Sequence, residues 1–238
     1  MSKGIAITGM GIISAIGNNV AENYDALINE RKGITRVDNV ETIQRDEIMV
    51  GEVKFTNSEL IAQLDLPPDN NYSRTAMLGA IAAKEAIASA GITDIKKFKT
   101  GIVSGTSVGG MDMTEKCYYE YLTEKKFQKY IESHHAGDST QKIAEQLEIE
   151  ESLVTTISTA CSSAANAIML GARLIKSGKL DRVIVGGADC LSKFTINGFK
   201  TLMILSDTFN TPFDENRKGL NLGEAAAFLV LESDEIVK

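Results

Sequence analysis

Cys161 is the residue of this sequence best placed to do chemistry. It follows a strand-like run of β-branched residues at 154–157 and precedes an alanine- and leucine-rich run at 164–176 that favours a helix. The sulfur is therefore expected at or near the first turn of a largely buried helix. Free N–H groups and the positive dipole end stabilise an anion there, and a thiolate is an anion. The neighbours at 158–163 are small and leave room for a substrate.

A free cysteine is more often a packed hydrophobic residue than a nucleophile, so packing is the competing interpretation for Cys161. The strand, turn and helix around it favour the catalytic one. The other two cysteines lack this setting, because Cys117 lies in a charged helical stretch and Cys190 follows a strand. Their spacing fits neither a zinc site nor a disulfide framework. We therefore expect one nucleophilic cysteine and no metal.

Near-continuous apolar runs alternate with helix-like segments along the chain. Strands that are apolar on both faces indicate a sheet covered by helices on both sides. We therefore predict an α/β fold with a mixed, mostly parallel sheet between helix layers, in a single domain over residues 1–238. Functional groups should gather at strand ends and helix starts, with Cys161, 108–110 and 9–11 as candidates. The expected strands are residues 5–9, 100–107, 154–157, 182–189 and 225–232, with a short edge strand at 52–55.

The clearest helix signal lies at 73–90, where small apolar residues line one face and Gly91 provides a C-terminal stop. A glycine-rich turn at 9–11 is expected before the first helix. The other expected helices are residues 20–29, 57–66, 112–131, 139–147, 164–176 and 193–204, the last interrupted by Gly198.

Two further patterns invite a functional interpretation, and neither supports one. Gly9 and Gly11 after the first strand suggest a dinucleotide-binding turn, but Ser14 stands where the third glycine belongs and no acidic residue closes a well-placed second strand. Nucleotide binding is therefore disfavoured and no cofactor is expected. His134 and His135 are adjacent, so their side chains point apart on any regular element. We expect this pair in a solvated loop.

Composition and charge exclude several classes of protein. The 238 residues are 43% hydrophobic and 24% charged, as in an ordinary globular domain. The net charge of −7 and the pI near 5.0 argue against a nucleic-acid or anionic-membrane partner. The chain runs at once into a strand, so no targeting segment is expected, and no apolar run approaches a membrane span. Three scattered cysteines fit a reducing cytoplasm.

Six segments carry a combined resemblance to a known family. They include an opening strand and turn, a glycine-rich segment that ends at Gly110, the nucleophile motif around Cys161, and a closing Pro-Phe-Asp motif. Together they resemble the amino-terminal half of a β-ketoacyl-acyl carrier protein synthase, of the elongating type with a thiolase-like fold. The similarity covers essentially the whole chain. The segments are residues 7–18, 105–110, 158–163, 181–189, 198–206 and 212–224.

The resemblance implies a decarboxylative Claisen condensation. Cys161 would accept an acyl chain from an acyl carrier protein as a thioester, and a malonyl-carrier unit would lose carbon dioxide and attack it. The backbone N–H of Cys161 would form half of an oxyanion hole. By position, Val108 would line the acyl pocket and Phe199 would gate it, although core packing also explains both. The charged residues of the closing motif are expected to be mainly structural: Asp214, Arg217 and Glu224.

The sequence departs from the family pattern in two places. Family members usually continue the closing motif as Gly-Glu-Gly-Ala-Gly, whereas alanines occupy 225–227 here, and their methyls narrow what fits against that turn. The family's two catalytic histidines and a lysine lie in a carboxyl-terminal half that we expect this chain to lack, and His134 and His135 do not match them. Losing one oxyanion donor typically costs about 3–4 kcal/mol. Acyl loading is therefore conceivable, but full turnover needs that half.

Three functions stay open. The first is a condensing acyltransferase that works with an acyl carrier protein and with acyl and malonyl thioesters. The second is a non-catalytic partner that shapes the pocket of a heterodimer, which Cys161 disfavours because such partners typically lack the nucleophile. The third is another thiolase-fold acyl transferase. A lone half would expose the surface that packs on its complement, so we expect a homo-oligomer or a complex with that half, and a clean monomer in light scattering would contradict this.

Overall fold

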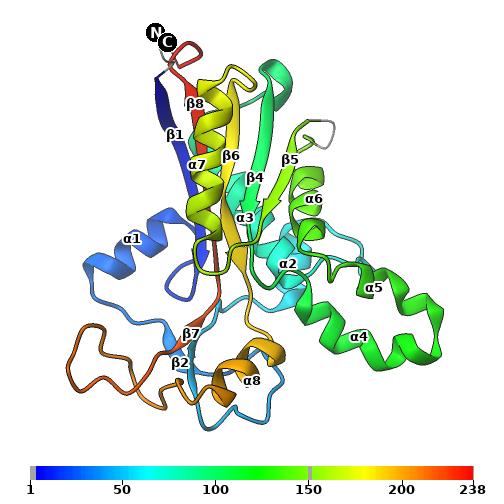
Figure 1. The fold of residues 1–238 in the computed structure, drawn as a ribbon, viewed down its shortest axis with the longest axis vertical. Helices are drawn as coiled ribbons and strands as arrows, with labels where there is room; N and C mark the ends of the chain where they lie inside the picture. Colours follow the sequence, from blue (N-terminus) through cyan, green and yellow to red (C-terminus); the bar gives the residue numbers. More distant parts are fainter. Residues whose placement is uncertain (1–3, 150–151, 238) are drawn as a thin grey trace.

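The computed structural model describes residues 4–149 and 152–237. Its largest feature is a five-stranded sheet with the order β1-β8-β6-β4-β5 (Figure 1). Strands β4, β5 and β6 run parallel, whereas β8 runs antiparallel to both β1 and β6. The predicted mixed sheet is confirmed. Its strands are β1 (Ile5–Ser14), β4 (Thr100–Gly105), β5 (Val154–Ile157), β6 (Arg182–Asp189) and β8 (Ala225–Ser233).

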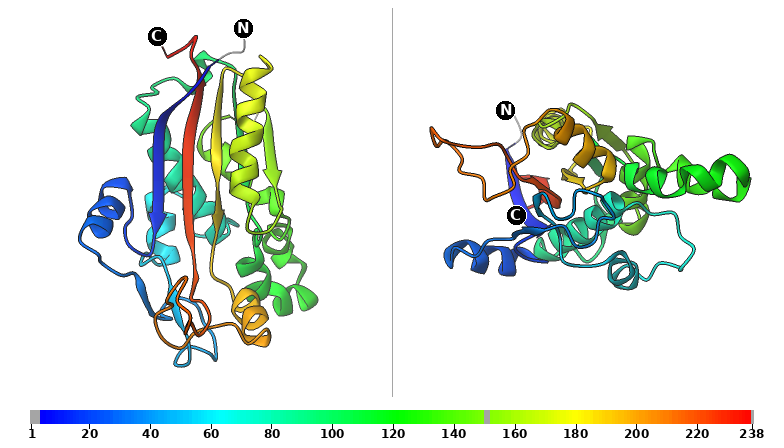
Figure 2. Two further views of the ribbon diagram at one scale, coloured as in Figure 1. Left: turned by 60° about the vertical axis from the view of Figure 1, so that its left-hand side comes forward. Right: turned by 90° about the horizontal axis from the view of Figure 1, so that it is seen from below.

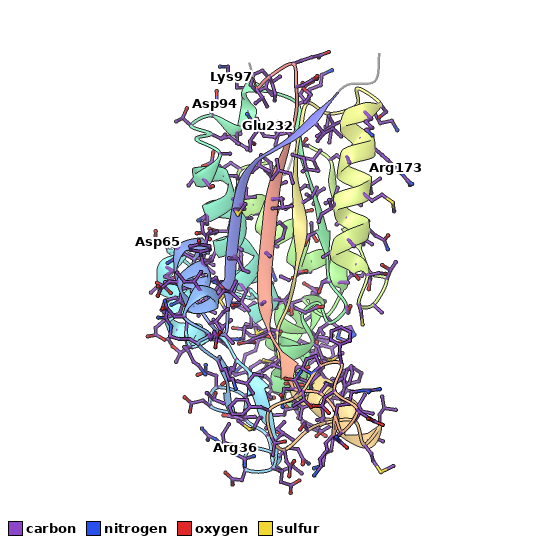
Figure 3. All side chains as sticks on the ribbon, turned by 90° about the vertical axis from the view of Figure 1, so that its left-hand side faces the viewer. Arg36, Asp65, Asp94, Lys97, Arg173 and Glu232 are labelled. Carbon is purple, nitrogen blue, oxygen red and sulfur yellow. The ribbon has the colours of Figure 1, made fainter. Side chains whose placement is uncertain are left out.

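Helices cover both faces of this sheet (Figure 2). Helices α3 (Arg74–Ser89) and α6 (Ala136–Gln146) lie on one face, and α7 (Ser163–Lys176) lies on the other. Successive side chains of β6 point to opposite faces of the sheet and so contribute to both cores. Ile184 packs in the core under α3, and Val183 packs in the core under α7. The outer side of α7 faces solvent, and Arg173 points away from the sheet there (Figure 3).

The expected turn at residues 9–11 is wrong, because β1 continues through it to Ser14. Gly9 and Gly11 lie where α3 crosses the strand closely. A Cβ on Gly11 would come within 2.1 Å of the Ala82 carbonyl oxygen, and one on Gly9 within 2.2 Å of the Ala86 carbonyl oxygen. These glycines therefore serve helix–sheet packing, and residues 9–11 do not belong to the functional edge of the sheet.

A second, three-stranded sheet lies below the first (Figure 1). It has the order β2-β3-β7 and packs near α8 (Lys193–Thr201), which Gly198 does not interrupt. The strand expected at 52–55 lies instead at β3, and the Glu52 carboxylate that follows it is buried and accepts the backbone N–H groups of residues 38–40. The strands are β2 (Ile34–Arg36), β3 (Met49–Gly51) and β7 (Leu222–Gly223).

The single helix expected at 112–131 is broken. Glu124 adopts an extended conformation with φ −134° and ψ 110°, which separates α4 (Met111–Thr123) from the short 3-10 helix η2 (Lys125–Phe127) and α5 (Gln128–Glu132). These elements form an arm that projects from the body of the protein (Figure 1).

The remaining helices lie close to their expected positions. They are α1 (Val20–Ile28) and α2 (Asn57–Gln63), and the structure adds a 3-10 helix that was not expected, η1 (Ile95–Lys97). Thr56 caps α2 through a reciprocal pair of hydrogen bonds with Glu59. Within residues 4–149 and 152–237, no helix has the length and apolar character needed to cross a bilayer.

Candidate functional site

The turn between β5 and α7 presents Cys161 to solvent. The strand ends at Ile157, and Cys161 lies two residues before Ser163, the first residue of the helix. Ala160 adopts a left-handed conformation with φ 51°, which lets the chain reverse within a few residues. The expectation that strand, tight turn and helix meet at this cysteine is confirmed.

Neighbouring polar side chains hold the turn in place. The Ser163 hydroxyl donates to the Ala160 carbonyl oxygen at 2.7 Å and accepts the Thr159 N–H at 2.9 Å. Asn166 donates to the Thr159 hydroxyl at 2.9 Å. The Ser163 hydroxyl is thus engaged in the scaffold, and the Cys161 sulfur is the reactive group that the turn displays.

The three cysteines differ in exposure to solvent, which a reactive thiol requires. Cys161 is exposed, whereas Cys117 and Cys190 are buried. Burial raises the pKa of the Cys117 thiol, and it raises the pKa of the Cys190 thiol well above the usual value. Both buried thiols therefore stay neutral and shielded near pH 7, which leaves Cys161 as the accessible nucleophile.

Cys161 lines a cavity of about 370 Å³. Small residues at the ends of β4, β6 and β8 line it, including Gly105, Gly187 and Ala225. The Cys161 N–H donates no hydrogen bond to the described part of the chain, and Ser162 makes no side-chain cap on α7. The Cys161 N–H is thus available to an oxyanion that forms next to the sulfur, whereas the N–H groups of Ser162 and Ser163 donate to the Thr159 and Ala160 carbonyl oxygens.

Asp189 fastens the glycine-rich loop that carries Val108. Its carboxylate accepts the Thr106 hydroxyl at 2.5 Å and the backbone N–H groups of Ser107 and Val108 at 2.9 Å each. The carboxylate also lies on the lining of the Cys161 cavity. Sequence reasoning did not single out this residue, although an acidic side chain at the end of a buried strand is a usable signal.

The two predicted pocket residues lie outside the lining of the Cys161 cavity. Val108 is half-buried in the loop after β4, and Phe199 is half-buried in α8. The structure as described does not bring either side chain to the sulfur. Their roles as pocket wall and gate stay predictions.

Glu224 is the centre of a buried polar network behind the cavity. Its side chain is fully buried and pairs with the Arg74 guanidinium at 2.6 Å. It also accepts the backbone N–H groups of Val53 and Leu191, each at 3.0 Å. These contacts agree with the structural role expected for Glu224. Two other charged residues of the closing motif, Asp214 and Arg217, are exposed.

The two histidines lie between α5 and α6 and are exposed. The expected solvated loop is incomplete as a description, because His135 caps α6: its Nδ1 accepts the Gly137 N–H at 3.0 Å. This cap explains why α6 begins at Ala136 and not at the expected residue 139. His134 lies 3.1 Å from the Thr114 hydroxyl. Neither histidine lines the cavity at Cys161.

Comparison with known sequences gives a consistent family match. Residues 2–236 match the family model described as "Beta-ketoacyl synthase, N-terminal domain". A 3-oxoacyl-[acyl-carrier-protein] synthase 2 of Staphylococcus aureus is 27% identical across 98% of this chain. Nodulation protein E of Rhizobium meliloti is 30% identical across 99% of it. The chain spans 58% and 59% of the length of these two relatives.

Solved structures agree with the sequence relatives. The ishigamide ketosynthase/chain length factor superposes with a TM-score of 0.89 at 27% identity, covering 99% of this chain and 59% of that one. The ketosynthase ApeO from Xenorhabdus doucetiae, determined in complex with its chain length factor ApeC, gives a TM-score of 0.80 at 28% identity, covering 98% and 58%.

Proposed function

The chain belongs to the β-ketoacyl synthase family, and from that premise we propose that Cys161 is the acyl-accepting nucleophile of a 3-oxoacyl-[acyl-carrier-protein] synthase in fatty acid or polyketide synthesis. The observation that carries this proposal is the exposed Cys161 sulfur, displayed by a strained turn in front of α7 within a cavity of small residues. That arrangement leaves one accessible thiol beside its own unoccupied backbone N–H.

The loading step follows from this geometry. The Cys161 thiolate attacks the carbonyl carbon of an acyl thioester, and the carbonyl oxygen becomes an oxyanion. The Cys161 N–H is free to donate to that oxyanion. Collapse of the tetrahedral intermediate breaks the bond to the carrier sulfur, which leaves as a thiolate and takes up a proton. The acyl group is then held as a thioester on Cys161.

Condensation requires further groups. A malonyl thioester loses carbon dioxide, and the resulting carbanion attacks the Cys161 thioester, forming the 3-oxoacyl product and releasing the Cys161 thiolate. Among the described residues, no imidazole lines the cavity to stabilise the developing enolate. We therefore assign loading to this chain and propose that decarboxylation relies on family residues that His134 and His135 do not match.

For partners, we propose an acyl carrier protein as acyl donor and a complementary chain or half as structural partner. The related ApeO structure contains a ketosynthase together with its chain length factor. In this chain, β5 ends the sheet order and its outer edge is unpaired with any described strand. Such an edge is suited to pairing with another chain. We place this assembly in the cytoplasm, in keeping with three unpaired cysteines.

The test of this function is acyl capture, measured by intact mass after incubation with an acyl thioester. We expect the wild-type chain and Cys117→Ala to gain one acyl group, and Cys161→Ala to gain none. Circular dichroism checks that each variant is folded. Equal labelling of Cys161→Ala and the wild type would refute the assignment. No labelling of the folded wild type would instead favour the non-catalytic partner role.

A further inference from the structure

Few of the residues that line the cavity at Cys161 could be replaced by larger ones without disturbing the fold. Gly105 and Gly187 form part of its wall beneath the start of α7. A Cβ on Gly105 would lie 2.5 Å from the Ala164 backbone nitrogen, and one on Gly187 would lie 2.8 Å from the Gly105 carbonyl oxygen. Backbone atoms cannot yield as a flexible side chain does, so this part of the wall is set by the packing of α7 on the sheet.

Three other residues that line the cavity already have structural roles, in hydrogen bonds or in the turn. Asp189 accepts three hydrogen bonds from the loop of residues 106–108. The Glu224 carboxylate is occupied by Arg74 and two backbone N–H groups. Ala160 has φ 51°, a conformation that disfavours larger residues. None of these positions can change without disturbing the loop, the buried network or the turn.

Ala225 differs from the lining residues described above. It begins β8 and is held on both sides, by pairing with Ser14 of β1 and with Asp189 of β6. Its side chain is exposed and has no polar atom to satisfy. The methyl group is therefore held by a backbone paired on both sides, lines the same cavity as the Cys161 sulfur, and is free of any other structural duty.

We propose that Ala225 determines acyl specificity: its methyl group limits the width of the cavity over Cys161, so that the site accepts straight-chain acyl thioesters and discriminates against acyl groups branched next to the carbonyl. This inference rests on the proposed function, because it concerns the acyl group that Cys161 receives. Branches next to the carbonyl are the atoms closest to the sulfur at the moment of attack. A difference of one methylene in a fitted pocket changes rates by about 10–200-fold.

The test first measures steric access to Cys161 without relying on acyl transfer. N-methylmaleimide and N-cyclohexylmaleimide share one chemistry, in which the sulfur bonds to an alkene carbon and the neighbouring carbon takes a proton from water. We expect Ala225→Leu to lower the cyclohexyl-to-methyl rate ratio at Cys161 by about tenfold or more, and Ala225→Gly to raise it. Ala227→Leu is the matched control, since Ala227 is also exposed on β8 but does not line the cavity.

The second measurement compares capture of butanoyl and 2-methylpropanoyl thioesters by the same variants. We expect Ala225→Gly to narrow the preference for the straight chain and Ala225→Leu to widen it. Equal maleimide ratios in all variants, or an equal change in Ala227→Leu, would overturn the role of Ala225 even if acyl capture occurs. A shifted maleimide ratio without acyl capture in the wild type would instead leave the steric role standing and remove the proposed function.

Discussion

At the start of α4, the Asp112 carboxylate is buried against the first residue of α3. Its Oδ2 accepts the backbone N–H of Arg74 at 2.8 Å, and its Oδ1 is buried with no hydrogen-bond partner among the described residues. Burial raises the pKa of Asp112 from 3.8 to about 6. An ionised carboxylate in this position therefore opposes folding at neutral pH.

This shift predicts a pH-dependent effect of Asp112→Asn. The folded state holds the Asp112 proton more tightly than the unfolded state, so the wild type loses stability as pH rises from about 4 to about 6 and no more from this group above that. The asparagine variant lacks this loss. Its free energy of unfolding, relative to the wild type, should rise by about 2–3 kcal/mol between pH 4 and pH 7. Urea unfolding at several pH values measures this.

A constant difference between Asp112→Asn and the wild type across that pH range would contradict the prediction. Asp69→Asn provides the control, because Asp69 is an exposed carboxylate whose contact with Lys129 is at the surface. Its difference from the wild type should stay small, since an exposed ion pair contributes at most about 1 kcal/mol.

The local setting of Cys161 could be predicted from the sequence because all of it lies within about twenty consecutive residues. β-branched residues, small turn residues and an apolar helix follow one another there, and each local preference agrees with the structure. The Asp189 clamp could not be found in this way. Its carboxylate and the Thr106 hydroxyl lie 83 positions apart, and only the pairing of β4 with β6 brings them together.

At the scale of elements, the sheet was predictable and the boundaries were not. Continuous apolar runs identify the strands because both faces of the sheet are covered by helices. Gly9 and Gly11 were misleading, since a glycine needed for close helix approach has the same sequence signature as one needed for a turn. The start of α6 was missed because it is capped by His135, which lies four residues before the start expected at residue 139.

The glycine interpretation predicts opposite effects for two Gly→Ala substitutions. In Gly11→Ala, the new Cβ would meet the Ala82 carbonyl oxygen at 2.1 Å and the Ala86 nitrogen at 2.6 Å, so α3 must move away from β1. Overpacking of this kind typically costs about 1–3 kcal/mol. Gly198→Ala should instead gain about 0.5–1 kcal/mol, because alanine favours a helix interior and no atom lies within 4 Å of the new methyl.

Chemical denaturation of both variants measures these changes. A Gly11→Ala protein as stable as the wild type would show that residues 9–11 do not support close packing of α3. Loss of stability in Gly198→Ala would show that α8 needs a break at that position, as the sequence alone had suggested.

At the scale of the whole molecule, the Arg74–Glu224 pair joins the two sheets. Arg74 begins α3, which packs on the large sheet, while Glu224 stands between β7 of the small sheet and β8 of the large one. The Arg74 guanidinium also donates at 3.0 Å to the carbonyl oxygen of Val53, two residues after the end of β3. The two side chains are 5% and 0% exposed, so water screens their interaction little.

Removing either partner should therefore loosen the small sheet and α8 from the rest of the protein. Arg74→Met leaves the buried Glu224 carboxylate without its ion-pair partner, and such a loss typically costs about 3–5 kcal/mol. The double variant Arg74→Met/Glu224→Gln should be less destabilised than the sum of its single variants, because no isolated charge remains buried. Urea unfolding measures the stability of each variant. Amide hydrogen exchange then compares the opening of the two sheets.

The pair acts as a connector only if the single variants also change how the molecule unfolds. In Arg74→Met, amides of β2, β3 and β7 should exchange before those of β4 and β6, whereas in the wild type all should share one transition. Arg31→Met is the control, because it breaks an exposed pair with Asp25 and should cost at most about 1 kcal/mol. Additive single-variant losses, together with simultaneous exchange of both sheets in Arg74→Met, would show that contacts other than the Arg74–Glu224 pair hold the small sheet in place.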